Sequence, residues 1–119
     1  MTGNFTGEER AYYLQRLAAL LDQARVQRRT LTYLEAADAL AIPGPKRIHK
    51  TARLLELLLK EDVDAGRPIR AALVTSRVPP GLPAAGFFDR ARRLGLYTGD
   101  DQAVFHARLL EELFSDSGR

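Results

Sequence analysis

The spacing of apolar residues near the start of the chain constrains the fold more than any other feature. These residues recur at intervals of three or four positions, as on one face of an α-helix; they are Leu14, Leu17, Leu21 and Ala24. Ahead of them, Thr6 and Glu9 fit a Thr-x-x-Glu capping box, in which each side chain accepts a hydrogen bond from the other residue's backbone N–H. The pattern predicts a long N-terminal helix over residues 7–27, with one face packed against a core.

The remainder of the chain alternates helical stretches with short β-prone ones. Residues 30–33 suit a small strand or the approach to a helix, and Pro43-Gly44-Pro45 must end the short helix that precedes it. The predicted order is a helix at 7–27, a β segment at 30–33, helices at 35–40 and 45–64, a strand at 69–75, a turn at 79–83, and helices at 84–94 and 100–114. The predicted fold class is mainly α with a small β-sheet (α+β), whose most regular strand is 69–75.

The length of 119 residues gives room for a single domain with one hydrophobic core. Within this domain, residues 1–119, we distinguish an N-terminal helix, a helix-turn-helix-like core, two C-terminal helices and a flexible tail. These parts cover residues 7–27, 30–78, 84–114 and 115–119.

Composition excludes several classes of protein. Cysteine is absent, which removes disulfides, thiol catalysis and zinc sites built on thiolates. The first residues lack the basic-then-apolar pattern of a signal peptide, and apolar runs such as Leu57-Leu58-Leu59 are far shorter than the roughly 20 residues that span a bilayer. We therefore expect a soluble, cytoplasmic protein with no membrane segment. The formal net charge of +3 permits a polyanionic partner, although its distribution is more informative than its total.

Two of the predicted helices are joined by the short linker Ile42-Pro43-Gly44-Pro45, an arrangement typical of a helix-turn-helix. In the second of these helices, apolar residues at helical spacing are predicted to face the core. They are Ile48, Ala52, Leu55 and Leu59.

Basic residues gather on another face of the same helix. Lys46, Lys50 and Arg53 are spaced at i, i+4 and i+7, and Arg47 and His49 flank them. A recognition helix needs separate basic and apolar faces, because its N-terminal half contacts bases and phosphates while its apolar face packs on the core. A basic face that is merely solvated, or that meets a protein partner, would have the same pattern.

Arg77 lies between the predicted strand and the proline-rich turn. In a helix-turn-helix domain with a wing, this position would touch backbone phosphates.

Three short runs carry a resemblance to a known family. They are Leu31-Thr32-Tyr33, Ala36-Ala37-Asp38-Ala39-Leu40 and Pro45-Lys46-Arg47-Ile48, followed by Pro68 and the predicted strand. Together they cover roughly residues 30–76 and resemble the winged-helix DNA-binding domain of alkylguanine-DNA alkyltransferases; Leu109-Leu110-Glu111 is similar to that family's closing helix. The resemblance implies that Tyr33 lies near a phosphate or a flipped nucleotide, and that Arg47 is the arginine inserted from the recognition helix.

The family's active-site motif, Pro-Cys-His-Arg, reads Pro68-Ile69-Arg70-Ala71 here, without the acceptor cysteine or the activating histidine. The resemblance therefore implies a non-catalytic binder of the alkyltransferase-like kind. A second likeness begins at residues 72–76 and continues with Gly81-Leu82-Pro83-Ala84-Ala85-Gly86-Phe87. It resembles a recurring prokaryotic module of unassigned function, which implies a compact winged-helix-like domain.

No catalytic constellation is found in the sequence. His49 and His106 are far apart and have no metal-ligand neighbours, and the adjacent acidic pairs, such as Glu111-Glu112, do not face each other on a helix. The glycines between Gly81 and Gly86 lack the spacing of phosphate-binding loops. We predict that the protein is not an enzyme and uses neither a metal nor a cofactor.

The leading prediction is a non-catalytic DNA-binding protein, a small regulator or accessory factor, that contacts double-stranded DNA. The residues predicted to do so are Tyr33, Lys46, Arg47, His49, Lys50, Arg53 and Arg77. The main alternative is a protein-protein interaction module, an adaptor or a homodimer, that docks through the helix at 7–27. A third interpretation is an enzyme subunit whose chemistry resides in another chain.

Overall fold

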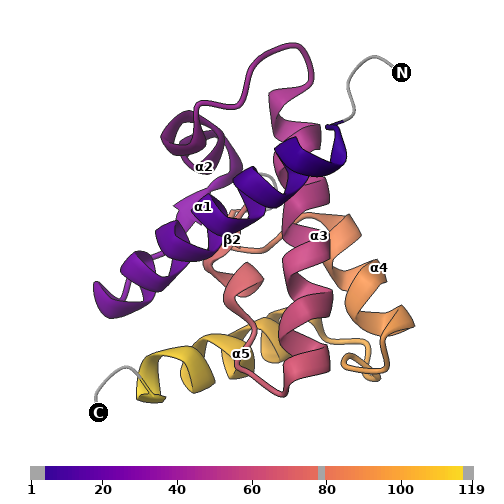
Figure 1. Cartoon of the computed structure of the whole chain (residues 1–119). Helices are drawn as coiled ribbons and strands as arrows, with labels where there is room; N and C mark the ends of the chain where they lie inside the picture. The colour runs from indigo at the N-terminus through magenta and orange to yellow at the C-terminus, as the bar shows by residue number, and fades with distance from the viewer. Residues whose placement is uncertain (1–4, 78–79, 117–119) are drawn as a thin grey trace.

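The computed structural model describes residues 5–77 and 80–116, in which five α-helices surround a short 3₁₀ turn and a two-stranded sheet (Figure 1). The helices are α1 (Gly7–Val26), α2 (Tyr33–Leu40), α3 (Arg47–Ala65), α4 (Ala85–Arg93) and α5 (Gln102–Asp116). The sheet pairs β1 (Leu31–Thr32) with β2 (Val74–Thr75) in parallel, and the 3₁₀ turn η1 (Arg70–Leu73) leads into β2. The predicted fold class, mainly α with a small sheet, is confirmed.

Local capping signals set the starts of the first two helices. At α1 the predicted capping box forms: the N–H of Thr6 donates to Glu9 Oε1 at 2.9 Å, and the N–H of Glu9 donates to Thr6 Oγ1 at 3.1 Å. A second box, between Thr32 and Glu35, starts α2 at Tyr33. Residues 30–33 therefore supply both a strand and a helix start, because Thr32 ends β1 and caps α2.

The prediction of a regular strand over 69–75 is wrong in most of its length. Residues Arg70–Leu73 form the 3₁₀ turn, and only Val74 and Thr75 pair with β1. The backbone N–H of Arg70 donates to the buried carboxylate of Asp62 at 3.1 Å, and the carbonyl of Ala72 lies 2.9 Å from His106 Nε2. These side chains provide hydrogen-bond partners that a sheet ladder would otherwise provide.

A buried carboxylate joins α3 to this turn. Asp62 is fully buried and accepts hydrogen bonds from Arg70 Nη2 at 2.8 Å and from Arg67 Nε at 3.2 Å. Arg70 also reaches Asp22 on α1 at 3.3 Å. The hydrogen bonds to Asp62 raise the pKa of Arg70 above its usual value, so the guanidinium stays charged. The network therefore links α1, α3 and η1.

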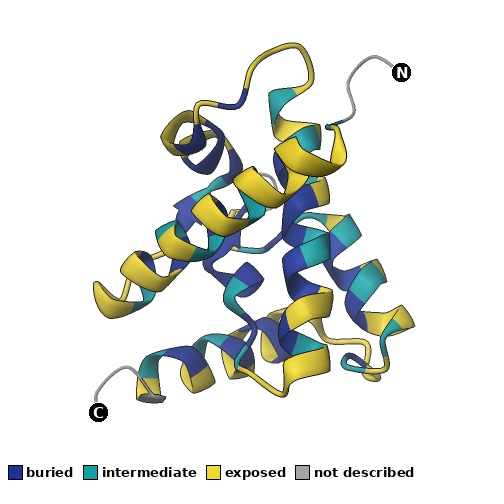
Figure 2. Cartoon of the chain, viewed as in Figure 1, coloured by how far each residue is buried: buried dark blue, intermediate teal, exposed yellow. Residues whose placement is uncertain are grey.

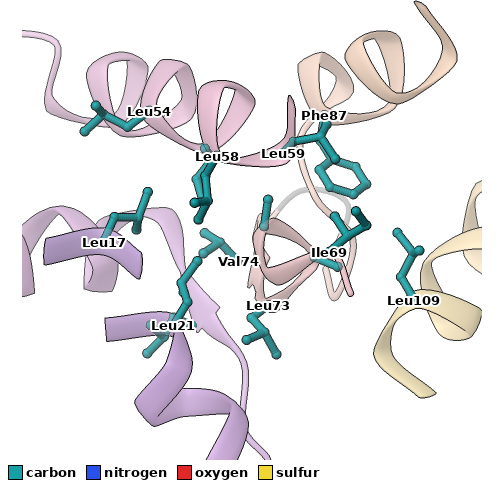
Figure 3. Packing of buried hydrophobic residues seen from close by; sticks show 14 of the residues in the cluster. Leu17, Leu21, Leu54, Leu58, Leu59, Ile69, Leu73, Val74, Phe87 and Leu109 are labelled. Carbon is teal, nitrogen blue, oxygen red and sulfur yellow. The ribbon is translucent and has the colours of Figure 1, made fainter. Parts of the chain in front are cut away.

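The hydrophobic core lies where the helices converge on η1 and β2. Figure 3 shows Leu17 and Leu21 of α1, Leu58 and Leu59 of α3, and Val74 of β2 pointing toward one another. The inner faces of the helices are buried and their outer faces exposed (Figure 2). A second part of the core is aromatic; its rings are Phe87, Phe88, Tyr97 and Phe105, with Tyr97 and Phe105 stacked 4.5 Å apart.

Helix α5 starts and ends differently from the prediction. It begins at Gln102 rather than at residue 100, and its first turn is capped by Asp101, whose Oδ1 accepts the N–H of Val104. The helix continues to Asp116, through part of the segment predicted as a flexible tail; residues 117–119 of that tail lie outside the described residues. Within residues 5–77 and 80–116, none of the helices combines the length and apolar character needed to cross a membrane.

His106 makes the stability of the fold dependent on pH. Burial lowers the pKa of His106 below its usual 6.5, because the imidazolium would lose its hydration. The unfolded chain binds a proton near pH 6.5, and the folded chain binds it only at lower pH. The free energy of unfolding should therefore be constant above about pH 7 and decrease as the pH falls below about 6.5.

Urea unfolding at pH 7.5 and pH 5.5 measures this effect. The parent should lose more unfolding free energy than His106→Gln between the two pH values, because only the parent has an imidazole that binds a proton more readily in the unfolded chain. Equal losses in the two proteins would show that His106 binds a proton as easily folded as unfolded.

Candidate nucleic-acid interface

Helices α2 and α3 are joined by residues 41–46 in the order expected of a helix-turn-helix. The linker turns sharply at both ends, since Ala41 and Lys46 adopt left-handed backbone conformations with φ of 55° and 64°. Between them Ile42 is buried and anchors the linker to the core, whereas Pro43 and Pro45 are exposed. The linker thereby places the first turn of α3 at the surface.

The inward face of α3 is rotated relative to the prediction. Leu55 and Leu59 are buried as expected, but Ile48 is 44% exposed and Ala52 is only partly buried. The buried residues are Thr51, Leu54, Leu55, Leu58, Leu59 and Asp62. An apolar pattern could not reveal Thr51 as a core residue; its hydroxyl is satisfied by donating to the carbonyl of Arg47 at 2.9 Å. Arg53 consequently lies opposite the core.

Arg47 is held within the helix-turn-helix rather than presented outward. Its Nε donates to the carbonyl of Ile42 at 2.9 Å, and its Nη2 forms an ion pair with Asp38 on α2. The guanidinium thus fixes the linker against both helices. Insertion into a DNA groove, which the family resemblance implies, would require both contacts to break.

Lys50 is partly engaged by neighbouring groups. Its Nζ donates to the carbonyl of Pro43 at 3.2 Å and lies 5.8 Å from the centre of the Phe5 ring. Neither partner carries a negative charge, so these contacts restrict the position of the ammonium without pairing it with a counter-charge.

Lys46, the N-cap residue of α3, and His49 and Arg53 on the helix itself are the exposed members of the predicted set in this region. No acidic residue occurs in the sequence between Asp38 and Glu56, and Asp38 is paired with Arg47. Among residues 5–77 and 80–116, neither Lys46 nor Arg53 forms an ion pair. Their charges are therefore not neutralised locally, as a phosphate-binding surface requires.

The exposed face of α3 opens onto a concavity of about 690 Å³ that α1 and α4 also line. In Figure 1 the start of α1 crosses the N-terminal half of α3, and α4 lies beside its middle. We call this concavity the basic groove; its basic residues are Arg10, His49, Lys50, Arg53 and Arg90. Arg10 and Arg90 were not predicted from the sequence, because they come from other helices.

One carboxylate, that of Glu56, lines the basic groove. It lies against Gly86 in the first turn of α4, so closely that a Cβ at Gly86 would meet Glu56 Oε2 at 2.8 Å. A negative charge is favourable at a helix N-terminus. In the described part of the chain Glu56 forms no ion pair with Arg90, so the cations remain in excess.

Tyr33 and Arg77 lie outside the basic groove. The Tyr33 ring is buried, and its hydroxyl accepts the backbone N–H of Ala84 at 2.9 Å. Burial, together with the nearby charge of Glu56, raises the pKa of this phenol, so it is neutral at physiological pH. Arg77 is exposed in the turn after β2, where its backbone bridges to Pro80.

The comparisons with known proteins add no relative. No protein-family model matches this chain, and no curated protein or solved structure matches it either.

Proposed function

We propose that this protein binds double-stranded DNA through the exposed face of α3 and the basic groove beside it. The observation that carries the proposal is the gathering of cations from three helices around one surface that has a single carboxylate. Such a surface raises the local concentration of a polyanion and releases counterions when it is occupied. No catalytic step is part of the proposal.

The contacts favour the phosphate backbone over the bases. Arg47, the residue expected to reach a base, is tied to Asp38 and Ile42, whereas Lys46 and Arg53 are exposed and form no ion pair with the described residues. Contacts of this kind position a protein on DNA without reading its sequence. The proposed binding is therefore weakly dependent on sequence and suits an accessory factor.

The winged-helix interpretation belongs to the same proposal. Helices α2 and α3 supply the helix-turn-helix, and the turn after β2 closes with a hydrogen bond from the N–H of Ser76 to the carbonyl of Leu82 at 2.6 Å. That turn stands in the place of a wing, with Arg77 exposed on it. The sheet itself is parallel and two residues long, unlike an antiparallel wing hairpin.

The alternative, docking of a protein through α1, has less support. Leu17, Leu21 and Ala24 of this helix are buried in the protein's own core and cannot contact a partner. The large exposed apolar residues of α1, Tyr12 and Val26, are 14 positions apart, which is about 21 Å along a helix, and make no continuous patch.

A mobility-shift titration with a random duplex, the matching single strand and an RNA duplex tests the proposal. We expect the DNA duplex to bind at low salt, with little difference between sequences, and to be displaced as salt is raised. Absence of binding to the DNA duplex at 25 mM KCl would refute the proposal. Preference for the single strand or RNA would refute the choice of duplex DNA.

Tyr33→Phe separates a structural role of this residue from a DNA contact. The variant should lose about 1–3 kcal/mol of unfolding free energy, because the N–H of Ala84 loses its acceptor. Its affinity for duplex DNA, measured at a temperature where both proteins are folded, should equal that of the parent. Full stability with weakened binding would instead favour a phosphate contact by the Tyr33 hydroxyl.

A further inference from the structure

Arg90 on α4 has a guanidinium nitrogen that the protein leaves unpaired. Its Nε is buried and has no hydrogen-bond partner, and Arg90 forms no ion pair with the described residues. A buried donor without an acceptor destabilises the folded protein, because it loses its hydrogen bonds to water and gains none in return. Such a group in a native structure calls for an explanation, and a ligand that supplies the acceptor is one.

The surroundings of Arg90 determine what kind of ligand would satisfy it. Arg90 lines the basic groove together with Arg53 and His49 of α3 and Arg10 of α1. The carboxylate that lines the groove, Glu56, is placed against Gly86 instead. A guanidinium offers a planar fork of N–H donors, which matches the oxygens of a phosphate group.

We infer that Arg90 forms a phosphate-binding subsite in the basic groove, occupied by a backbone phosphate of bound DNA. This inference rests on the proposed function and extends it from α3 to α4. It means that the DNA backbone follows the groove between α1 and α4, so that Arg53 and Arg90 bind neighbouring phosphates. The ligand chemistry is a phosphate group held by a planar guanidinium.

The test uses three variants of the whole chain. Arg90→Gln removes the charge, Arg90→Lys keeps the charge but removes the Nε–H, and Arg93→Gln is the matched control from the same helix. Arg93 is exposed and does not line the basic groove. Because Nε is unpaired in the free protein, the melting temperature of Arg90→Gln should equal or exceed that of the parent, which a structural role would not permit.

Duplex binding should respond differently in the three variants. Arg90→Gln should weaken binding on the order of tenfold at 100 mM KCl and flatten the slope of log affinity against log salt by about 0.9. Arg90→Lys should keep the slope but bind more weakly than the parent, since the lysine ammonium lacks the planar fork. Arg93→Gln should bind like the parent.

Nuclear magnetic resonance of the Arg90 Nε–H identifies the source of the phosphate. The signal is assigned by its loss in Arg90→Lys and followed during titration with a 12-base-pair duplex and with inorganic phosphate. The inference predicts a shift with duplex at stoichiometric concentration and a weaker response to inorganic phosphate at millimolar concentration.

The other outcomes separate the two proposals. If duplex binds while the Arg90 signal stays in place and Arg90→Gln binds normally, the subsite is refuted and the proposed function stands. If inorganic phosphate shifts the signal but duplex does not bind, the proposed function is refuted, and with it the assignment of the subsite to DNA. If neither ligand has an effect, both are refuted.

Discussion

Replacing Asp62 with asparagine should lower the free energy of unfolding by about 3–5 kcal/mol, a large part of the 5–15 kcal/mol typical of a single domain. The Asp62 carboxylate is fully buried and accepts from Arg67, from the Arg70 side chain and from the Arg70 backbone. Asparagine would leave the guanidinium of Arg70, whose side chain is only 11% exposed, without a buried counter-charge. Urea unfolding measures the loss.

Asp64→Asn is the matched control for this prediction. Asp64 lies on the same helix and pairs with Lys60 at 2.7 Å, but both side chains are about half exposed. An exposed pair of this kind contributes about 0.3–0.5 kcal/mol. A second variant, Asp62→Leu combined with Arg70→Met, removes both charges and should be much less destabilising than Asp62→Asn. If Asp62→Asn were no more destabilising than Asp64→Asn, the buried ion network would not hold η1 against α3.

The role of Asp62 also explains which parts of the fold could be predicted from the sequence. The capping box at Thr6 and Glu9 and the extent of α1 depend on residues within one or two turns, so local patterns predicted them. The 3₁₀ turn at Arg70–Leu73 depends on Asp62, eight residues earlier, and on His106, more than thirty residues later. Only tertiary contacts could reveal that these groups occupy the backbone of a β-prone segment.

The candidate site shows the same contrast between features set by local sequence and features set by tertiary contacts. Charge spacing on one helix predicted Lys46 and Arg53 as exposed cations, because that pattern is local. It could not predict that Arg47 would be paired with Asp38 or that Tyr33 would accept from Ala84. Nor could it predict Arg10 and Arg90, which reach the basic groove from α1 and α4.

Removing two cations, one at the N-cap of α3 and one on α3 itself, should have the largest effect on binding. Lys46 and Arg53 are exposed and form no ion pair in the part of the chain that the structure describes. The double variant Lys46→Gln with Arg53→Gln should bind duplex DNA of any sequence more weakly than the parent, because two phosphate contacts are lost. Its folding stability should change by less than about 0.5 kcal/mol, since neither side chain packs in the core.

A control with the same change in net charge is needed to separate local contacts from general attraction. Arg29 and Arg108 are exposed, and neither lines the basic groove. The double variant Arg29→Gln with Arg108→Gln therefore lowers the net charge equally while leaving the proposed interface intact. A comparable loss of binding in both double variants would indicate non-specific attraction rather than a defined surface.

The dependence of duplex affinity on salt, measured for the parent and both double variants, tests the proposed function most directly. We expect the removal of Lys46 and Arg53 to flatten the slope of log affinity against log salt by about 1.8, at about 0.9 for each phosphate contact. The Arg29 and Arg108 variant should keep the slope of the parent. Equal slopes for the parent and the Lys46 and Arg53 variant, or no duplex binding by the parent at low salt, would contradict the proposed function.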